Sequence, residues 1–387
     1  MQFQANRIDL LNTVRKVEKA APSRSTLAAL KCILLEADAE ASEITLYATD
    51  FEASIRHVVS ADSGAVIRTS GSAVINAALL LGMLSLLKDD VVHIGYTKNS
   101  AQQITVSSGN ASFCINCLPV KDFPRPPMPV PEYTAPLTKL CTLVKKTAFT
   151  AATSNDNPVL QCVSVQHNNS IAAATDGYKL IMTRLDKQET PPQDELLIPA
   201  AHLQLLASIS TDEDVYNVGV ADKHIVFTKQ NMTFTTRRVD GDFIQVAQLI
   251  KAVVPKYTAI AEAKQVKEAL DLVLAGTDAK RAVVNIVLLP DTIRIAASSD
   301  DYYALHEIEA TVSAPTPTDG FYYKADGMTK LFNVMQGNVK LEIDTRGMLL
   351  LKTPSDVCLV VAQNKPQSKK VVKRTKSKNI ETTKEAA

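Results

Sequence analysis

The sequence contains no tryptophan, and aromatic residues make up only 5% of its 387 positions. Hydrophobic residues still account for 46%, so any core must be built mainly from leucine, valine, isoleucine and alanine. No run approaches the ~18–20 apolar residues needed to span a bilayer; the longest candidate, 77–87, is interrupted by Gly82 and Ser85. The polar start, Met1–Arg7, offers no signal peptide. We therefore expect a cytoplasmic protein with no membrane partner.

The sequence also lacks the short motifs that hold phosphates, dinucleotides or a catalytic serine. Its six histidines form no H-x-H or H-x-x-x-H pair, and Cys114 and Cys117 form the one C-x-x-C pair among six cysteines. No second pair completes a zinc site. Residues three apart on a strand point to opposite faces, so we expect reduced, buried thiols. The sequence predicts no catalytic residue, no metal site and no cofactor.

The net charge of +1 conceals an uneven distribution of charged residues. Residues 365–387 hold eight of the 42 basic side chains and two of the 41 acidic ones. Residues 1–364 are left with 34 basic and 39 acidic side chains, a net charge of −5. The basic segment is rich in lysine, serine and threonine and has no hydrophobic periodicity, which predicts a disordered tail.

One pattern occurs three times along the chain. Two hydrophobic, strand-like runs lead into a small residue and an acid, and the three copies end at Asp50, Asp176 and Asp300. The spacings are 126 and 124 residues, about the size of one small domain. Repetition at this period predicts three similar domains, which is more typical of a structural frame than of a single active site. The pattern predicts domains at 1–128, 129–253 and 254–364, followed by the tail at 365–387.

Each repeat is predicted to hold two helices and several short strands. Its first helix has an apolar stripe at helical spacing, formed in turn by Leu10, Val14, Val17 and Ala21, by Leu137, Leu140, Val144 and Ala148, and by Val266, Leu270, Val273 and Leu274. The second helices are expected at 77–87, 200–209 and 328–335, and alternating strands follow them. Two helices packed on a mainly antiparallel sheet give an α+β fold.

Basic residues lie off the apolar stripe of all three first helices. They are Arg15, Lys16 and Lys19, then Lys139, Lys145 and Lys146, then Lys264 and Lys267. One such face on one helix usually only contacts water. The same charge on the same face in three repeats of an acidic body favours a surface that contacts phosphates without reading bases.

The segment Thr175-Asp176-Gly177 has the composition of a catalytic aspartate turn. The same dipeptide occurs at Thr49-Asp50 in the first repeat, which favours a repeated structural turn instead. Two other functions remain open on the residues alone. One is a hydrolase that uses Asp176 as acid or base, although no second carboxylate recurs at matched spacing. The other is a monomeric scaffold that binds proteins and not DNA.

Several ordered segments resemble the bacterial sliding clamp, the beta subunit of DNA polymerase III. The most specific are Leu118–Pro124 (LPVKDFP), Ala174–Leu180 (ATDGYKL) and Arg238–Phe243 (RVDGDF). Ser25–Leu30 and Ala48–Glu52 also match, and the resemblance covers residues 1 to about 364. It implies three repeated clamp domains per chain and a closed, head-to-tail dimeric ring around double-stranded DNA. The implied function is that of a non-enzymatic processivity factor in DNA replication.

The resemblance also implies two kinds of binding site. Arg24 matches an arginine that contacts duplex DNA, whereas other basic positions of the family fall on Ala77 and Ala201. With the helical residues above, the candidate DNA contacts are Arg24, Arg15, Lys16, Lys139, Lys146 and Lys264. A hydrophobic pocket for peptides of the polymerase III catalytic subunit, the clamp loader and other partners falls on Leu160, Thr175, Gly177, Tyr178, Lys179, Leu180, Ile244, Gln248, Leu249, Val360 and Val361.

The end of the chain departs from the family pattern. Ile244 replaces an expected proline, Gln248 often an arginine, and 21 residues follow Pro366 where the family normally stops. We hypothesise that Lys369–Lys378 adds a sequence-independent grip on DNA that replaces charge lost from the ring interior. The alternative is a tail that only improves solubility.

Overall fold

The structure is a computed structural model of the chain. It describes residues 1–60, 64–97, 100–154, 157–166, 170–185, 195–278, 281–299 and 301–365. Asp300 and the tail from residue 366 onward, both subjects of predictions above, lie outside the described residues. The chain divides into two compact units, each described here by itself. Unit 1 comprises Met1–Val253 with Leu350–Val360, and unit 2 comprises Val254–Leu349 with the residues from Val361 onward.

Unit 1 holds two complete sheets and most of a third. The first has the order β5 (Val66–Thr69), β1 (Gln2–Asn6), β7 (Val91–Thr97), β8 (Ser100–Ser108), β9 (Ala111–Asn116). The second has the order β10 (Ala135–Leu137), β15 (Tyr216–Ala221), β16 (His224–Lys229), β17 (Met232–Arg237), β4 (Ala53–Ser60), β3 (Glu43–Thr49), β2 (Cys32–Asp38), β6 (Gly71–Asn76). The third runs β14 (Leu196–Pro199), β11 (Cys162–Gln166), β12 (Ile171–Thr175), β13 (Lys179–Arg184), β26 (Asp356–Val360), β25 (Leu349–Lys352).

The helices of unit 1 are α1 (Arg7–Val17), α2 (Ala77–Leu86), α3 (Leu140–Thr147), α4 (Ala200–Ala207) and α5 (Val246–Ala252). Short 3-10 turns lie at Glu18–Ala20, Ala28–Lys31, Val120–Asp122, Ala148–Thr150 and Pro158–Gln161. Unit 2 contains the sheet β21 (Tyr303–Glu309), β20 (Thr292–Ser298), β19 (Val283–Leu288), β23 (Phe321–Lys324), and the strands β24 (Asn338–Ile343), β18 (Tyr257–Glu262) and β22 (Thr311–Ala314). Its helices are α6 (Ala263–Leu274) and α7 (Ala325–Phe332).

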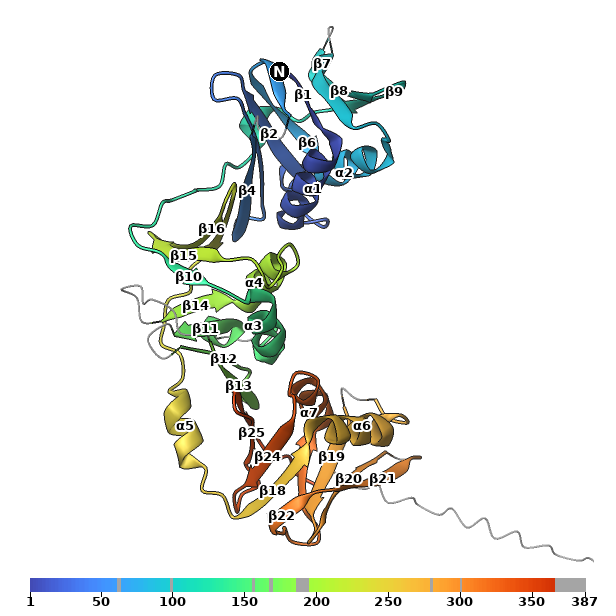
Figure 1. Ribbon diagram of the computed structural model, residues 1–387, viewed down its shortest axis with the longest axis vertical. Helices are drawn as coiled ribbons and strands as arrows, with labels where there is room; N and C mark the ends of the chain where they lie inside the picture. The colour runs from blue at the N-terminus through green and yellow to red at the C-terminus, as the bar shows by residue number, and fades with distance from the viewer. Residues whose placement is uncertain are drawn as a thin grey trace, which may run out of the picture. The chain divides into compact units, whose positions relative to one another are not determined.

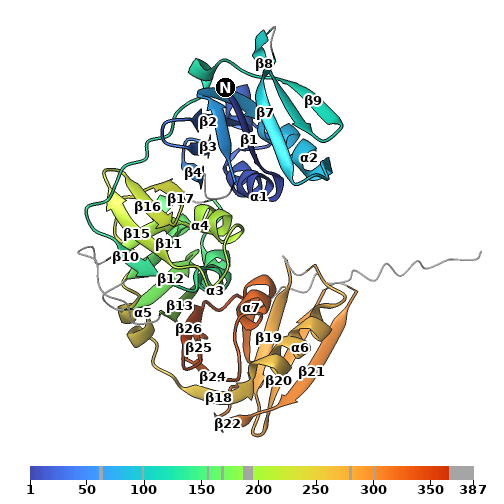
Figure 2. The same cartoon turned by 45° about the horizontal axis from the view of Figure 1, so that its top comes forward.

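The apolar stripes place the first helices on their sheets. In α1, Leu10, Val14 and Val17 are fully buried, and the Asn6 side chain caps the helix by accepting hydrogen bonds from the N–H groups of Ile8 and Asp9. In Figures 1 and 2, α1 lies beside α2, α3 beside α4, and α6 beside α7, in each case on one side of the neighbouring strands. The predicted α+β layer of paired helices on antiparallel strands is confirmed.

Two predicted helix boundaries were wrong. Leu137 belongs to β10, and α3 starts at Leu140 because the Lys139 backbone is left-handed, with a φ of 51°. Helix α7 starts at Ala325, three residues before the predicted Met328. Helical periodicity identifies the buried face of a helix but does not determine the residue at which the helix begins.

The sheets of successive repeats are joined by strand pairing. Strand β17, the last of the second repeat, pairs with β4 of the first, with Thr236 opposite Ala53. Strand β26, the last of the third repeat, pairs with β13 of the second, with Val360 opposite Lys179. In both joints the receiving strand is the one that follows the acidic turn. Strands β9 and β21 hold the corresponding positions in the first and third repeats, and both lie at sheet edges.

His57 lies in the β4–β17 joint, opposite Met232, and its Nδ1 atom has no hydrogen-bond partner among the described residues. Burial, together with the Lys16 and Lys229 charges, lowers the pKa of His57 from 6.5 to about 4. Because the unfolded chain binds this proton near pH 6.5 and the folded chain only near pH 4, the free energy of unfolding falls as pH drops through that window.

We expect acidification from pH 7 to pH 5 to cost about 2 kcal/mol through this one group. Urea unfolding of wild type and His57→Gln at both pH values measures it, and the variant should lose less stability. His93→Gln, which replaces an exposed histidine, is the control and should behave like wild type. Equal losses for His57→Gln and wild type would contradict the prediction.

Candidate functional site

The acidic turns of the first two repeats have the same hydrogen bonds. The Asp50 carboxylate accepts from the N–H groups of Glu52 and Ala53, at 3.0 and 2.7 Å. The Asp176 carboxylate accepts from those of Tyr178 and Lys179, both at 2.9 Å. The hydroxyl of the preceding threonine completes each turn, and the residue after each acid has a positive φ, 78° at Phe51 and 89° at Gly177. The prediction of a repeated structural turn is confirmed.

The environment of Asp176 opposes a catalytic role. Its second carboxylate oxygen is paired with the Lys179 ammonium. Burial raises the pKa of Asp176, but the Lys179 side chain and the backbone N–H groups outweigh it, and the net pKa lies below the usual 3.8. A general acid needs the opposite shift, toward the working pH.

The third copy of the turn keeps one of these backbone hydrogen bonds among its described residues. The N–H group of Ser299 donates to the Tyr302 carbonyl at 2.8 Å, as that of Asp176 does to the Lys179 carbonyl. Ser299 therefore holds the backbone position that Asp176 holds in the second repeat. The predicted acid of this copy, Asp300, lies outside the described residues.

The cysteines are all free. Cys32, Cys162 and Cys358 are buried, whereas Cys114 is exposed, contrary to the prediction of buried thiols. Cys114 lies on the edge strand β9, which has one open side. Among the described residues, no group of three histidine, cysteine, aspartate or glutamate side chains is placed to hold a metal ion.

Several residues of the predicted peptide pocket lie next to one another within unit 1. Its residues in the β12–β13 turn and on β13 lie beside β26, because Lys179 pairs with Val360 and Leu180 with Leu359. Thr175, Leu180 and Val360 are buried. Tyr178 is 57% exposed. The turn therefore combines buried side chains on the paired strands with one exposed aromatic ring.

A second segment approaches the pocket residues from α5. A Cβ atom on Gly241 would come within 2.8 Å of the Val159 side chain, so the loop before α5 packs beside the 3-10 turn that contains Leu160. The same loop continues through Ile244 to Gln248 and Leu249, and Leu249 is 43% exposed. Val361 belongs to unit 2.

The predicted DNA-binding cations differ in their surroundings. Arg15 and Arg24 are exposed, Lys16 is half-buried, and none of the three forms an ion pair with a described residue. Lys139 is exposed at the start of α3. Lys264 lies 3.9 Å from Glu268, one helical turn away, with both side chains exposed. A pair of this kind contributes little and leaves the cation open to a stronger anion.

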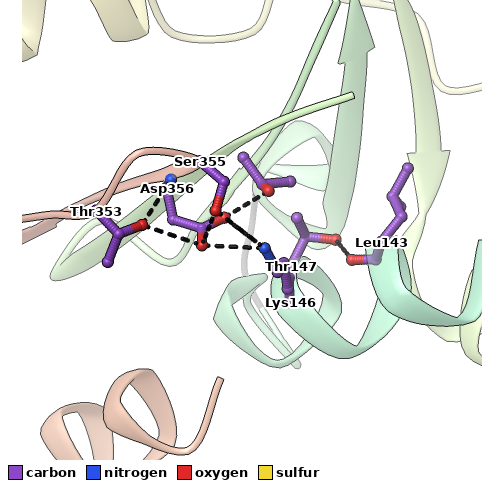
Figure 3. Close-up of polar contacts among 7 residues, drawn as sticks. Leu143, Lys146, Thr147, Thr353, Ser355 and Asp356 are labelled. Carbon is purple, nitrogen blue, oxygen red and sulfur yellow. Dashed lines mark hydrogen bonds and ion pairs between the residues drawn. The ribbon is translucent and has the colours of Figure 1, made fainter. Parts of the chain in front are cut away.

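Lys146 is the exception among these cations (Figure 3). Its ammonium lies 3.0 Å from both carboxylate oxygens of Asp356. Asp356 is buried and also accepts hydrogen bonds from the hydroxyls of Thr183, at 2.6 Å, and Ser355, at 2.8 Å. The sequence grouped Lys146 with the exposed lysines, whereas the structure places it in a buried polar cluster that fastens α3 to β26.

Comparison with known proteins identifies the family. The model of the DNA polymerase III beta subunit N-terminal domain matches residues 1–127, and the model of its central domain matches residues 134–245. The chain belongs to this family of sliding clamps. The beta sliding clamp of Bacillus subtilis is 25% identical over 380 residues, which cover 93% of this chain and 98% of that protein. That of Pseudomonas aeruginosa is 25% identical over 312 residues, 78% and 82% of the two chains.

Solved structures share the fold. The sliding clamp of Bacillus subtilis superposes with a TM-score of 0.85 at 22% identity and covers 95% of this chain and 100% of its own. A beta subunit from Eubacterium rectale gives 0.85 at 18% identity, with coverages of 94% and 99%. Family membership makes the chain a processivity factor and not an enzyme, in agreement with the structural role of Asp176.

Sequence analysis did not identify Asp356 as the partner of Lys146. The two residues are 210 positions apart, and their only sequence signal is indirect. Strand β26, like β17, pairs antiparallel with the strand that follows the acidic turn of the preceding repeat. Its first residues must therefore lie at the end of β13. The pairing of β13 with β26 brings Asp356 opposite Thr183 and within reach of α3.

We expect Lys146→Met to lower the free energy of unfolding by about 3 kcal/mol, because it leaves the buried Asp356 carboxylate without a counter-charge. Chemical denaturation measures the change. Lys145→Met, on the exposed face of the same helix, is the control and should stay within about 0.5 kcal/mol of wild type. Equal stability of the two variants would show that the cluster does not hold α3 to β26.

Proposed function

We propose that two copies of this chain close head to tail into a ring that encircles duplex DNA without reading its sequence. The ring tethers the DNA polymerase III catalytic subunit, the clamp loader and other proteins that carry a clamp-binding peptide. Each chain supplies three domains, at 1–128, 129–253 and 254–364, and the complex works in the cytoplasm. Membership of the sliding clamp family and the rule of strand pairing support this proposal.

The pairing rule supports ring closure. In two joints, the last strand of one repeat adds to the strand after the acidic turn of the preceding repeat. Continuing the rule requires β9 of one copy to add to β21 of another, and both of these strands lie at sheet edges. The six residues of β9 carry no charge, so the edge lacks the usual protection against pairing. On β21, Tyr303 and Leu305 are 69% and 41% exposed.

Cations on the first helices and next to them supply the DNA contact. Arg15, Lys16, Arg24, Lys139 and Lys264 contact backbone phosphates, which carry no base information. Topological enclosure, and not affinity, keeps the ring on DNA, so few and weak contacts suffice and sliding stays fast. Lys146 is excluded from this set because Asp356 neutralises it. The segment Lys369–Lys378, outside the described residues, adds a further grip.

The peptide pocket forms around the β12–β13 turn and the loop before α5. Leu180 and Val360 form its floor, and Tyr178 and Leu249 offer exposed apolar surface to the side chains of a partner peptide. Ile244 keeps this loop apolar where the family has proline. Gln248 is neutral where the family often has arginine. A partner peptide is therefore expected to depend less on an acidic residue next to this position.

A loaded ring should stay on nicked circular DNA and slide off the same DNA after linearisation. Gel filtration of clamp, loader and DNA at moderate salt separates bound from free protein and measures the difference. Leu305→Asp, which places a charge on the β21 edge, should lose most retention on the circle and run near the monomer mass of 41.9 kDa.

Ile260→Asp is the matched control, because Ile260 is 40% exposed on β18, which is paired on both sides, with β22 and β24, and is therefore not a sheet edge. It should remain a dimer. Equal retention of wild type on circular and linear DNA would contradict enclosure, and a dimeric Leu305→Asp would contradict closure through β21.

A further inference from the structure

A small cavity of about 220 Å³ lies against α3 within unit 1, and neither the ring closure nor the peptide pocket uses it. Its lining is strongly basic and rich in hydroxyl groups, and consists of Thr138, Lys139, Thr142, Leu143, Lys146, Thr183, Arg184, Leu185 and Ser355. Three of these nine residues are cations, four carry hydroxyls, and none is acidic. A concave surface of this composition favours an anion.

The floor of the cavity is rigid. Lys146 is fixed by Asp356, and the Thr183 and Ser355 hydroxyls donate to the same carboxylate (Figure 3). The backbone of Arg184 is held as well, since its N–H group donates to the Ser355 carbonyl at 2.9 Å. The backbone that carries these cations is therefore held in place, which lowers the entropy lost when an anion binds.

The charges around the cavity do not cancel. Lys146 is matched by Asp356. The Asp212 carboxylate accepts from the N–H group and the hydroxyl of Thr142, at 2.9 and 2.7 Å. These hydrogen bonds are the main reason why the pKa of Asp212 is lowered, and the Lys139 charge is a smaller cause. Arg184 is exposed, and its guanidinium has no hydrogen bond or ion pair with the described residues.

We propose that this cavity binds one phosphate group, with the Arg184 guanidinium as its main ligand and Lys139 as a second cation. The planar guanidinium of an arginine can bind two phosphate oxygens at once, and this geometry distinguishes a phosphate-binding site from a merely basic surface. The inference rests on the proposed function and extends it: α3 holds a fixed phosphate contact in addition to the diffuse attraction of its exposed lysines. The phosphate belongs either to the DNA backbone or to a free nucleotide or phosphate ion.

The test compares Arg184→Ala with Arg68→Ala. Arg68 is also exposed, lies on β5 away from the cavity, and matches the charge removed. Each protein is titrated with a short DNA duplex over a series of salt concentrations, and separately with inorganic phosphate followed by calorimetry in a phosphate-free buffer. Arg184→Lys is included because it keeps the charge and removes the planar guanidinium.

For duplex DNA, we expect Arg184→Ala to reduce the slope of log affinity against log salt by about 0.9, the loss of one phosphate contact. Arg68→Ala should leave the slope unchanged, and Arg184→Lys should lose affinity while keeping most of the slope. If Arg184→Ala loses only the binding of inorganic phosphate, the site binds a free phosphate or nucleotide and not the DNA backbone. If Arg184→Ala matches Arg68→Ala in both titrations, the proposal is overturned.

These results are independent of the retention of rings on circular DNA. If the phosphate-binding site is absent, the ring should still be retained on circular DNA. If the ring is not retained but Arg184→Ala still reduces the slope of log affinity against log salt, the ring is rejected and the phosphate-binding site is kept.

Discussion

The architecture depends on one constraint: the backbone N–H and C=O groups of a strand edge need hydrogen-bond partners, which either water or another strand supplies. Within unit 1 this need is met between repeats. Strand β17 adds to β4, and β26 adds to β13, in each case next to the acidic turn. The rule leaves β9 and β21 as open edges of the same kind. A chain that repeats this joint has a natural route to closure, in which the unpaired end of one copy meets the unpaired end of another.

Residues that resemble catalytic or binding groups in the sequence stabilise these joints between strands. Asp50 and Asp176 are the most conspicuous acids of the repeat, and both use their carboxylates to satisfy backbone N–H groups at the start of a receiving strand. Lys146 and Asp356 fasten the β26 strand to α3 in the same region. The polar residues thus build a frame, and in the proposed function that frame acts by enclosing DNA. A processivity factor needs no reactive group, only a closed path and a weak, uniform contact with phosphates.

The sequence predicted well what short-range patterns determine. Apolar spacing identified the buried faces of the first helices, and the dipeptide repeated at Thr49-Asp50 and Thr175-Asp176 identified a structural turn, because both depend on neighbours within a few residues. It predicted less well what depends on distant pairing. Lys146 looked like an exposed lysine because nothing near it in sequence announces Asp356, which the β13–β26 pairing brings close. Similarly, the edge position of Cys114 depends on sheet order, which periodicity does not encode.

The central claim is that the strand-pairing rule continues across two copies of the chain until the path closes. Imaging of single particles by electron microscopy tests it most directly. The account predicts a closed ring with two-fold symmetry, a central channel wide enough for duplex DNA and a mass near twice 41.9 kDa. An open rod, or a compact particle without a channel, would contradict it.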